Sequence, residues 1–282
     1  MKPLRATPRD KAVLRDLWLF RYLSTRQISR LHFGHVKLAQ RRLRTLAENR
    51  LVDRFQPGGA RQAGFRTWWY RLANRGARIV AGGEDVRPED ILPPVRRPRS
   101  WHFVAHHALV TDFRVWLREG LNNSEFSAGF IPAYEEVKGQ RRPRIALEVP
   151  GHVRLLIPDG VFMLQRGEMR ALFMLEVDRG TEPLTGKHKS SITRKLQRYR
   201  AAFDARKEEH FEKLFDANFN GFRILCLVPD RQRLEAFLRL AARMDLTPLV
   251  WVTTSSLVEE TGDLDQRCWA ITIDDPPHAL TE

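Results

Sequence analysis

The fold of the C-terminal part is decided by two apolar segments that flank a short turn: IPDGVFML at residues 157–164 and ALFMLEVDRGT at residues 171–181. The residues between them include RGE at 166–168, whose glycine suits a tight turn. Apolar runs on either side of such a turn are typical of a β-hairpin. The predicted hairpin places Asp159 and Glu176 nearly opposite one another, because the midpoint between the two positions falls in that turn.

Three carboxylates are expected at the end of this hairpin. Glu176 and Asp178 are two residues apart on a strand and share a face, and Asp159 lies across from them. Burying like charges together is costly unless a cation or a proton compensates. Oxygen ligands of this kind suit Mg²⁺ or Mn²⁺, which can polarise a phosphodiester and activate water. The alternative is that Asp159 only makes a turn and that Glu176 pairs with Arg179 or Arg194.

A helix that begins near Ile192 follows the hairpin. Lys195 lies at the edge of its apolar stripe and is expected to face the sheet. Two continuous apolar strands, 222–228 and 249–253, flank a helix, and this order implies that they are parallel. Residues 101–282 are therefore predicted to form an α/β domain with a mixed central sheet.

The helix that opens this domain, residues 101–119, is expected to bury a stripe that runs from Phe103 through Val110 to Leu117. His106 and His107 are adjacent on it. Neighbouring side chains on a helix point about 100° apart, so these two cannot chelate one metal ion together. A structural histidine is the expectation.

Positive charge is concentrated at the N-terminus. Residues 1–100 hold 23 Lys+Arg and 8 Asp+Glu, a net charge of +15, whereas residues 101–282 hold 25 and 26, a net charge of −1. A field localised in this way is typical of polyanion binding, because each cation that meets a phosphate releases counterions. Double-stranded DNA is the predicted partner, and an anionic membrane or an acidic protein is the alternative.

The same region has the pattern of a winged helix-turn-helix domain, residues 1–85. Helices are predicted over 8–22, 24–32 and 36–49, followed by strands at 51–55 and 67–72. In such a domain the third helix enters the major groove and the loop between the strands lies along the DNA backbone. The candidate DNA-binding residues are Lys37, Gln40, Arg41 and Arg44 on the third helix and Arg61 and Arg66 in the loop. A winged helix used for protein contacts is the alternative.

Residues 86–100 contain four prolines and are predicted to be a linker. No apolar run reaches the length of a membrane span, and the N-terminus does not have the pattern of a secretory signal. The sequence therefore predicts a cytoplasmic protein that does not associate with membranes.

Several motifs together resemble the replication-relaxation proteins of bacterial plasmids and integrative elements. They are the predicted winged helix, Pro158-Asp159, EVDRGT at 176–181, Lys195-x-x-x-Tyr199, and His107, Leu109, Val110 and Asp112 on one helix. The resemblance covers nearly the whole chain. It implies a role in the replication, mobilisation or regulation of a mobile element, with DNA and replication or conjugation proteins as partners.

The C-terminal part also resembles the PD-(D/E)XK nuclease fold. This likeness makes Asp159, Glu176, Asp178 and Lys195 the candidate catalytic residues, with Asp159 and Glu176 holding Mg²⁺ or Mn²⁺. The sequence departs from the pattern at Asp178, where a lysine is expected, and Lys195 would supply the charge from the following helix. Three functions stay open: a metal-dependent endonuclease or nickase, a transcriptional regulator whose inactive nuclease-like domain serves homodimerisation or partner binding, and an adaptor for replication proteins.

Overall fold

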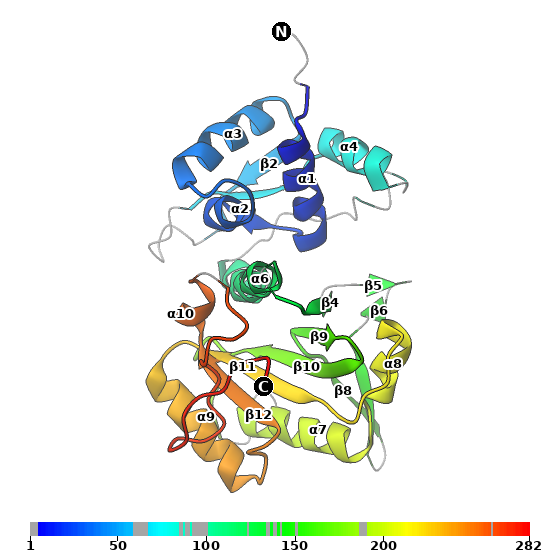
Figure 1. Ribbon diagram of the computed structural model, residues 1–282, viewed down its shortest axis with the longest axis vertical. Helices are drawn as coiled ribbons and strands as arrows, with labels where there is room; N and C mark the ends of the chain where they lie inside the picture. The colour runs from blue at the N-terminus through cyan, green and yellow to red at the C-terminus, as the bar shows by residue number, and fades with distance from the viewer. Residues whose placement is uncertain are drawn as a thin grey trace. The chain divides into compact units, whose positions relative to one another are not determined.

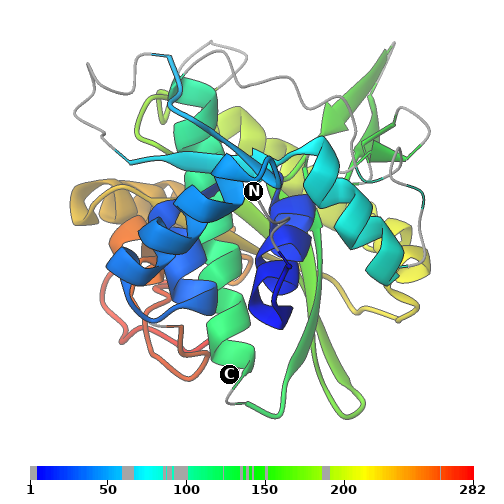
Figure 2. The same cartoon turned by 90° about the horizontal axis from the view of Figure 1, so that it is seen from above.

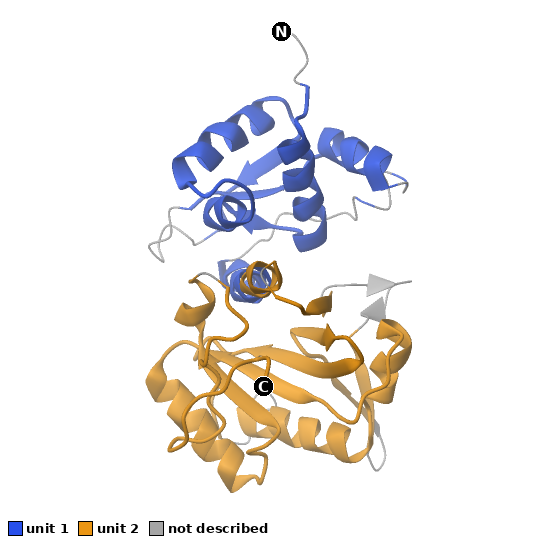
Figure 3. Ribbon diagram, viewed as in Figure 1, with its two compact units in different colours: residues 1–115 blue, residues 116–282 orange. Residues whose placement is uncertain are grey.

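The computed structural model describes residues 5–58, 67–84, 87, 91, 101–122, 124–133, 136–137, 140–141, 143–149, 152–185, 191–260 and 262–282. The chain divides into two compact units, residues 1–115 and 116–282 (Figure 3). Two predicted DNA contacts, Arg61 and Arg66, lie outside the described residues, as does most of the predicted linker at 86–100. The predicted domain limits therefore remain predictions.

Unit 1 combines helices with a small antiparallel sheet of strand order β1-β3-β2. Helix α1 lies between α3 and α4 in both views (Figures 1 and 2). The elements are α1 (Pro8–Phe20), β1 (Leu23–Ser24), α2 (Thr25–His32), α3 (Val36–Glu48), β2 (Val52–Phe55), β3 (Trp69–Leu72) and α4 (Asn74–Glu84). The helices and strands expected from residue 8 to residue 72 are thus present, and β1 is an additional strand that the sequence pattern did not predict.

The helix starts of unit 1 follow from their capping residues. Thr7 and Asp10 form a capping box at the start of α1, and Ser24 and Gln27 form one at the start of α2. In each box two backbone amides that have no partner inside the helix are bonded by side chains, which stabilises the first turn. The spacing of Ser24 and Gln27, three residues apart, is the sequence pattern of such a box.

Helix α6 (Trp101–Leu121) begins in unit 1. His107 is buried and donates a hydrogen bond to the carbonyl of Phe20 over 2.9 Å. Burial lowers the pKa of His107 to about 3, so the imidazole is neutral and structural, as expected. The predicted stripe was wrong at its first position, because the Phe103 side chain is 52% exposed and stacks on the His107 ring.

The central sheet of unit 2 is mixed and has the strand order β12-β11-β10-β9-β4. Its strands are β4 (Ser127–Pro132), β9 (Gly160–Arg166), β10 (Met169–Val177), β11 (Arg223–Val228) and β12 (Val250–Thr254). Strands β10, β11 and β12 are parallel, whereas β9 is antiparallel to both of its neighbours. The prediction of a mixed sheet with a parallel pair near the C-terminus is confirmed.

The β9–β10 hairpin has the predicted register. Arg166 pairs with Met169 and Gly160 pairs with Leu175, so the turn is Gly167-Glu168. Gly167 has a φ of 58°, a conformation that glycine adopts without strain. At the other end, a Cβ on Gly160 would come within 2.3 Å of the Phe130 ring on β4, so a side chain there would require the ring or the strand to move.

Helices α7 (Ile192–Asp204) and α9 (Arg231–Arg243) share one hydrophobic core with the sheet (Figure 1). Leu172 and Met174 of β10 belong to this core, as do Leu196 and Tyr199 of α7. The remaining elements of unit 2 are β5 (Glu136–Val137), β6 (Gln140–Arg141), β7 (Ile145–Val149), β8 (His152–Leu156), α8 (Glu209–Phe215) and α10 (Ser255–Val258). Strands β7 and β8 form a separate hairpin against α7. Within the described ranges, no helix has both the length and the apolarity needed to cross a bilayer.

Candidate functional site

Glu176 continues the buried face of β10. Alternate residues of a strand share a face, so Glu176 follows Leu172 and Met174 toward the core shared with α7. Its side chain is only 7% exposed, although it carries a carboxylate. A buried carboxylate at the end of an apolar face requires a cation, a proton or hydrogen-bond donors beside it. Glu176 and its neighbours are therefore the candidate site.

Asp159 is held beside Glu176 by the backbone of β10. The Asp159 amide donates to the Leu175 carbonyl over 2.9 Å, and the Asp159 Oδ2 accepts from the Val177 amide over 2.8 Å. These two bonds continue the hairpin register by one residue and fix the carboxyl group across the strand. The structure therefore brings together the two acids that the sequence placed opposite one another.

Helix α7 supplies two donors to Glu176. Lys195 and Tyr199 are four residues apart and project from the same face of α7. Lys195 Nζ forms an ion pair with Glu176 Oε2, and the Tyr199 hydroxyl donates to Glu176 Oε1. The inward orientation predicted for Lys195 is confirmed, and Lys195 is the cation that Glu176 contacts. Tyr199, which the sequence indicated only as part of the Lys195-x-x-x-Tyr199 motif and not as a site residue, is a further member of the site.

The electrostatic state of the site is set by burial and by the second acid. Burial raises the pKa of Glu176 to about 7; the Lys195 charge opposes this rise and the Asp159 charge adds to it. Burial alone would lower the pKa of Lys195, but Glu176 and Asp159 together raise it. Lys195 is thus a permanent cation at neutral pH, whereas Glu176 gains or loses its charge in that range.

Asp178 has a partner of its own. It is buried, its Oδ2 accepts from Arg233 Nε, and its Oδ1 accepts from the Gly180 amide over 2.9 Å. Arg233 also donates to the Glu182 carbonyl, which links the segment after β10 to α9. The three acids of the hairpin end therefore divide into Asp159 and Glu176 with Lys195, and Asp178 with Arg233. In the described part of the chain, no three His, Cys, Asp or Glu residues form a group that would hold a metal ion.

Sequence reasoning missed Arg233, although one signal was present. Parallel strands end at the same sheet edge, and the Asp178 amide donates to the Leu227 carbonyl of β11 over 2.9 Å. The first turn of α9, which Asp230 caps, therefore begins close to the end of β10. Arg233 lies in that turn, so the order of the strands could have indicated it as the partner of Asp178.

On unit 1, helix α3 has one buried and one exposed face. Ala39, Leu43 and Leu46 are fully buried. The predicted DNA contacts on this helix are all exposed: Lys37, Gln40, Arg41 and Arg44. The arrangement leaves a polar and cationic stripe on the outer face of α3.

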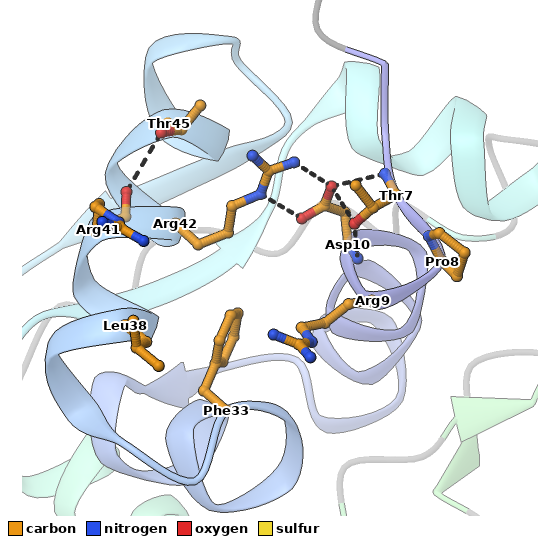
Figure 4. A pocket seen from close by; sticks show the side chains of 9 residues that line it. All are labelled: Thr7, Pro8, Arg9, Asp10, Phe33, Leu38, Arg41, Arg42 and Thr45. Atoms are coloured by element: carbon orange, nitrogen blue, oxygen red, sulfur yellow. Dashed lines mark hydrogen bonds and ion pairs between the residues drawn. The ribbon is translucent and has the colours of Figure 1, made fainter.

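A groove of about 550 Å³ lies beside this stripe, between α3 and the start of α1 (Figure 4). Arg9 and Arg41 line it, and the Arg9 guanidinium lies 5.3 Å from the centre of the Phe33 ring. Arg42 also lines the groove but is occupied: its Nε donates to Asp10 Oδ1 over 2.7 Å, and a second nitrogen pairs with Asp10 Oδ2. Arg42 thus links α3 to the first turn of α1, while Arg41 faces outward.

Comparison with known proteins identifies the family. No curated protein matches the chain, and no solved structure does either. The family model described as replication-relaxation matches residues 14–217, well over half of the sequence. The matched segment includes Asp159, Glu176 and the helix that carries Lys195 and Tyr199. This chain therefore belongs to the replication-relaxation family.

Proposed function

We propose that this protein binds and processes the DNA of a mobile genetic element, and that Asp159, Glu176 and Lys195 form a divalent-metal-dependent endonuclease or nickase site. The family assignment supports a role in replication or mobilisation. The observation that carries the proposal is the buried Glu176, which lies next to a second acid and contacts a lysine and a tyrosine. A perturbed, charge-coupled acid of this kind is typical of functional sites.

Unit 1 is the proposed DNA reader, as a winged helix-turn-helix domain. Helices α2 and α3 are joined by a short turn, and strands β2 and β3 form the hairpin that corresponds to the wing. The exposed stripe of Lys37, Gln40, Arg41 and Arg44 would enter the major groove, where arginine and glutamine bind base edges and phosphates. The net charge of the N-terminal region supports this role.

Unit 2 is the proposed processing domain, with a PD-(D/E)XK-like core. Its order of helix, strand, hairpin, helix and strand places one acid before β9, one on β10 and a cation on the following helix. Mg²⁺ is commonly held by one or two carboxylates together with water and substrate phosphates, so Asp159 and Glu176 fit this ion without a third acid. When bound, such an ion would polarise a phosphodiester and activate water. Lys195 would stabilise the negative charge that develops on the phosphate.

One observation favours a second candidate function. The position where a PD-(D/E)XK enzyme has its lysine is occupied by Asp178, which pairs with Arg233. Asp178 is therefore charge-paired without a metal, as Glu176 is with Lys195. This arrangement suits a transcriptional regulator whose nuclease-like domain is inactive and serves dimerisation or partner binding.

The experiment that separates the two candidates incubates supercoiled plasmid with the protein and Mg²⁺ or Mn²⁺. We expect nicked or linear product from the wild type and loss of product from Asp159→Asn and Glu176→Gln. Glu168→Gln is the control, because Glu168 is an exposed acid at the opposite end of the same hairpin. DNA binding without cutting would support the regulator, and cutting that survives both site variants would place the activity elsewhere.

A further inference from the structure

A further concentration of cations among the described residues lies in unit 2, around α7. A groove of about 300 Å³ runs between α7 and the β7–β8 hairpin. Its lining residues are Leu147, Glu148, Arg154, Arg194, Gln197, Arg198, Ala201, Ala205 and Lys207. Four of these are cations and one is an acid. Residues 101–282 as a whole are nearly neutral, so the groove is a local excess of positive charge.

The helix face explains why the groove is both open and basic. Arg194, Arg198 and Ala201 follow one face of α7 at intervals of four and three residues, and Ala205 caps the end of the helix. The two alanines leave space near the end of the helix, and the two arginines fill the remainder with charge. Leu147 on β7 is buried and forms an apolar floor.

Three of these cations, Arg194, Arg198 and Lys207, lack counter-charges in the described part of the chain. Arg194, Arg198 and Lys207 are half-buried, and within the described residues no side-chain hydrogen bond or ion pair involves them. The Arg198 Nε is buried and has no hydrogen-bond partner there. In contrast, Arg200 on the same helix contacts both Asp204 and Asp245. Partly desolvated cations that form no ion pair are costly, so the groove is complementary to an anionic ligand.

We infer that this groove binds the phosphodiester backbone of DNA, as a contact separate from α3. Arginine binds phosphate bidentately, and its charge persists at any physiological pH. Arg194 directly precedes Lys195 and Arg198 directly precedes Tyr199. A strand held in the groove would therefore lie along the same helix that contacts Glu176. The inference rests on the proposed function only in taking DNA as the polyanion.

The test measures binding of labelled single-stranded and duplex oligonucleotides of arbitrary sequence by fluorescence anisotropy over a salt series. The variant is Arg194→Gln with Arg198→Gln. The control is Arg239→Gln with Arg243→Gln, which removes the same charge from the exposed side of α9. We expect the slope of log affinity against log salt to fall by about one per groove arginine, and to change less in the control.

The oligonucleotide arms show whether one strand or a duplex occupies the groove. A slope equal to that of the control with both probes would overturn the inference. If Arg198→Gln prevents folding, as thermal unfolding would show, Arg194→Gln with Lys207→Gln takes its place with the same expectation.

A parallel variant, Arg41→Ala with Arg44→Ala, separates this inference from the proposed role of α3. Loss of slope in the groove variant alone would support the groove and contradict the reader role of α3. Loss in the α3 variant alone would do the reverse.

Discussion

Two buried carboxylates, one in each unit, are paired with cations in opposite ways. Asp10 accepts from two Arg42 nitrogens and from both the amide and the hydroxyl of Thr7. These donors lower the pKa of Asp10 even though burial opposes them. Glu176 has Lys195 and Tyr199, but it also has a second acid beside it, and its pKa rises to about 7. A carboxylate saturated with donors is structural, whereas one that is short of compensation is poised to exchange a proton or take up a cation.

The largest expected effect is a difference in how the two acids respond to pH. The folded-state pKa of Glu176 is raised, so its contribution to stability is complete below about pH 4.5 and is lost as pH rises through about 7. Asp10 has a lowered pKa, so its contribution is present above its unfolded-state value of 3.8 and is lost in stronger acid. Glu176→Gln should therefore gain on the order of 3 kcal/mol relative to wild type between pH 5 and pH 8.

Urea unfolding at pH 5 and pH 8 measures this difference. Asp10→Asn is the matched variant, and its destabilisation should be nearly the same at both pH values. A Glu176→Gln effect that is also independent of pH would mean that the acid is ionised throughout, and the contrast between the two sites would disappear.

The next largest effect is expected from Arg42, the cation that pairs with Asp10. Arg42→Met leaves Asp10 buried without its main partner and should destabilise the protein by about 2–3 kcal/mol, less than the roughly 3–5 kcal/mol for a fully buried pair because Arg42 is 29% exposed. Arg41→Met, at the neighbouring exposed position, should leave stability unchanged and weaken DNA binding. Chemical denaturation and a binding titration of both variants test the pair. Equal stability losses would contradict the assignment of Arg42 as structural and Arg41 as outward-facing.

The smallest expected effect comes from the hydroxyl of Tyr199. Tyr199→Phe keeps the buried ring but removes a donor to Glu176, which should cost about 1 kcal/mol and raise the pKa of Glu176 further. The pH at which nicking reaches half its maximum should rise, because Glu176 then ionises at a higher pH. The pH–rate profile of the variant measures this shift. A fall in rate with an unshifted profile would show that Tyr199 acts only in packing.

Local patterns in the sequence were sufficient for the hairpin and its acids. Turn position alone fixes the register of a two-stranded pairing, so the residue numbers of Asp159 and Glu176 were enough to place them opposite one another. The inward direction of Lys195 followed from the helical period. The capping box of Ser24 and Gln27 was equally local, since its two side chains are three residues apart.

The missed features depend on packing between distant segments. Arg233 meets Asp178 across 55 residues of sequence, and Arg42 meets Asp10 across 32. Helical periodicity alone does not show which of two neighbouring faces of a helix is buried. The prediction therefore placed Phe103 in the core, whereas the buried side chain is that of His107. In the α7 groove, Arg194 and Arg198 share a helix face, but Arg154 joins them only because the β7–β8 hairpin packs on α7.

The contact between Gly160 and Phe130 has a consequence for the acid that precedes it. A residue with any side chain at 160 would have to displace the Phe130 ring or push β4 away from β9. The Ala133 amide just after β4 donates to the Asp159 carbonyl over 3.0 Å, so a movement of β4 would reach the peptide that bears Asp159. An edge strand that contributes no reactive group thereby helps the backbone of β10 to hold Asp159 in place. The choice of residue at position 160 is thus limited by an aromatic neighbour rather than by chemistry.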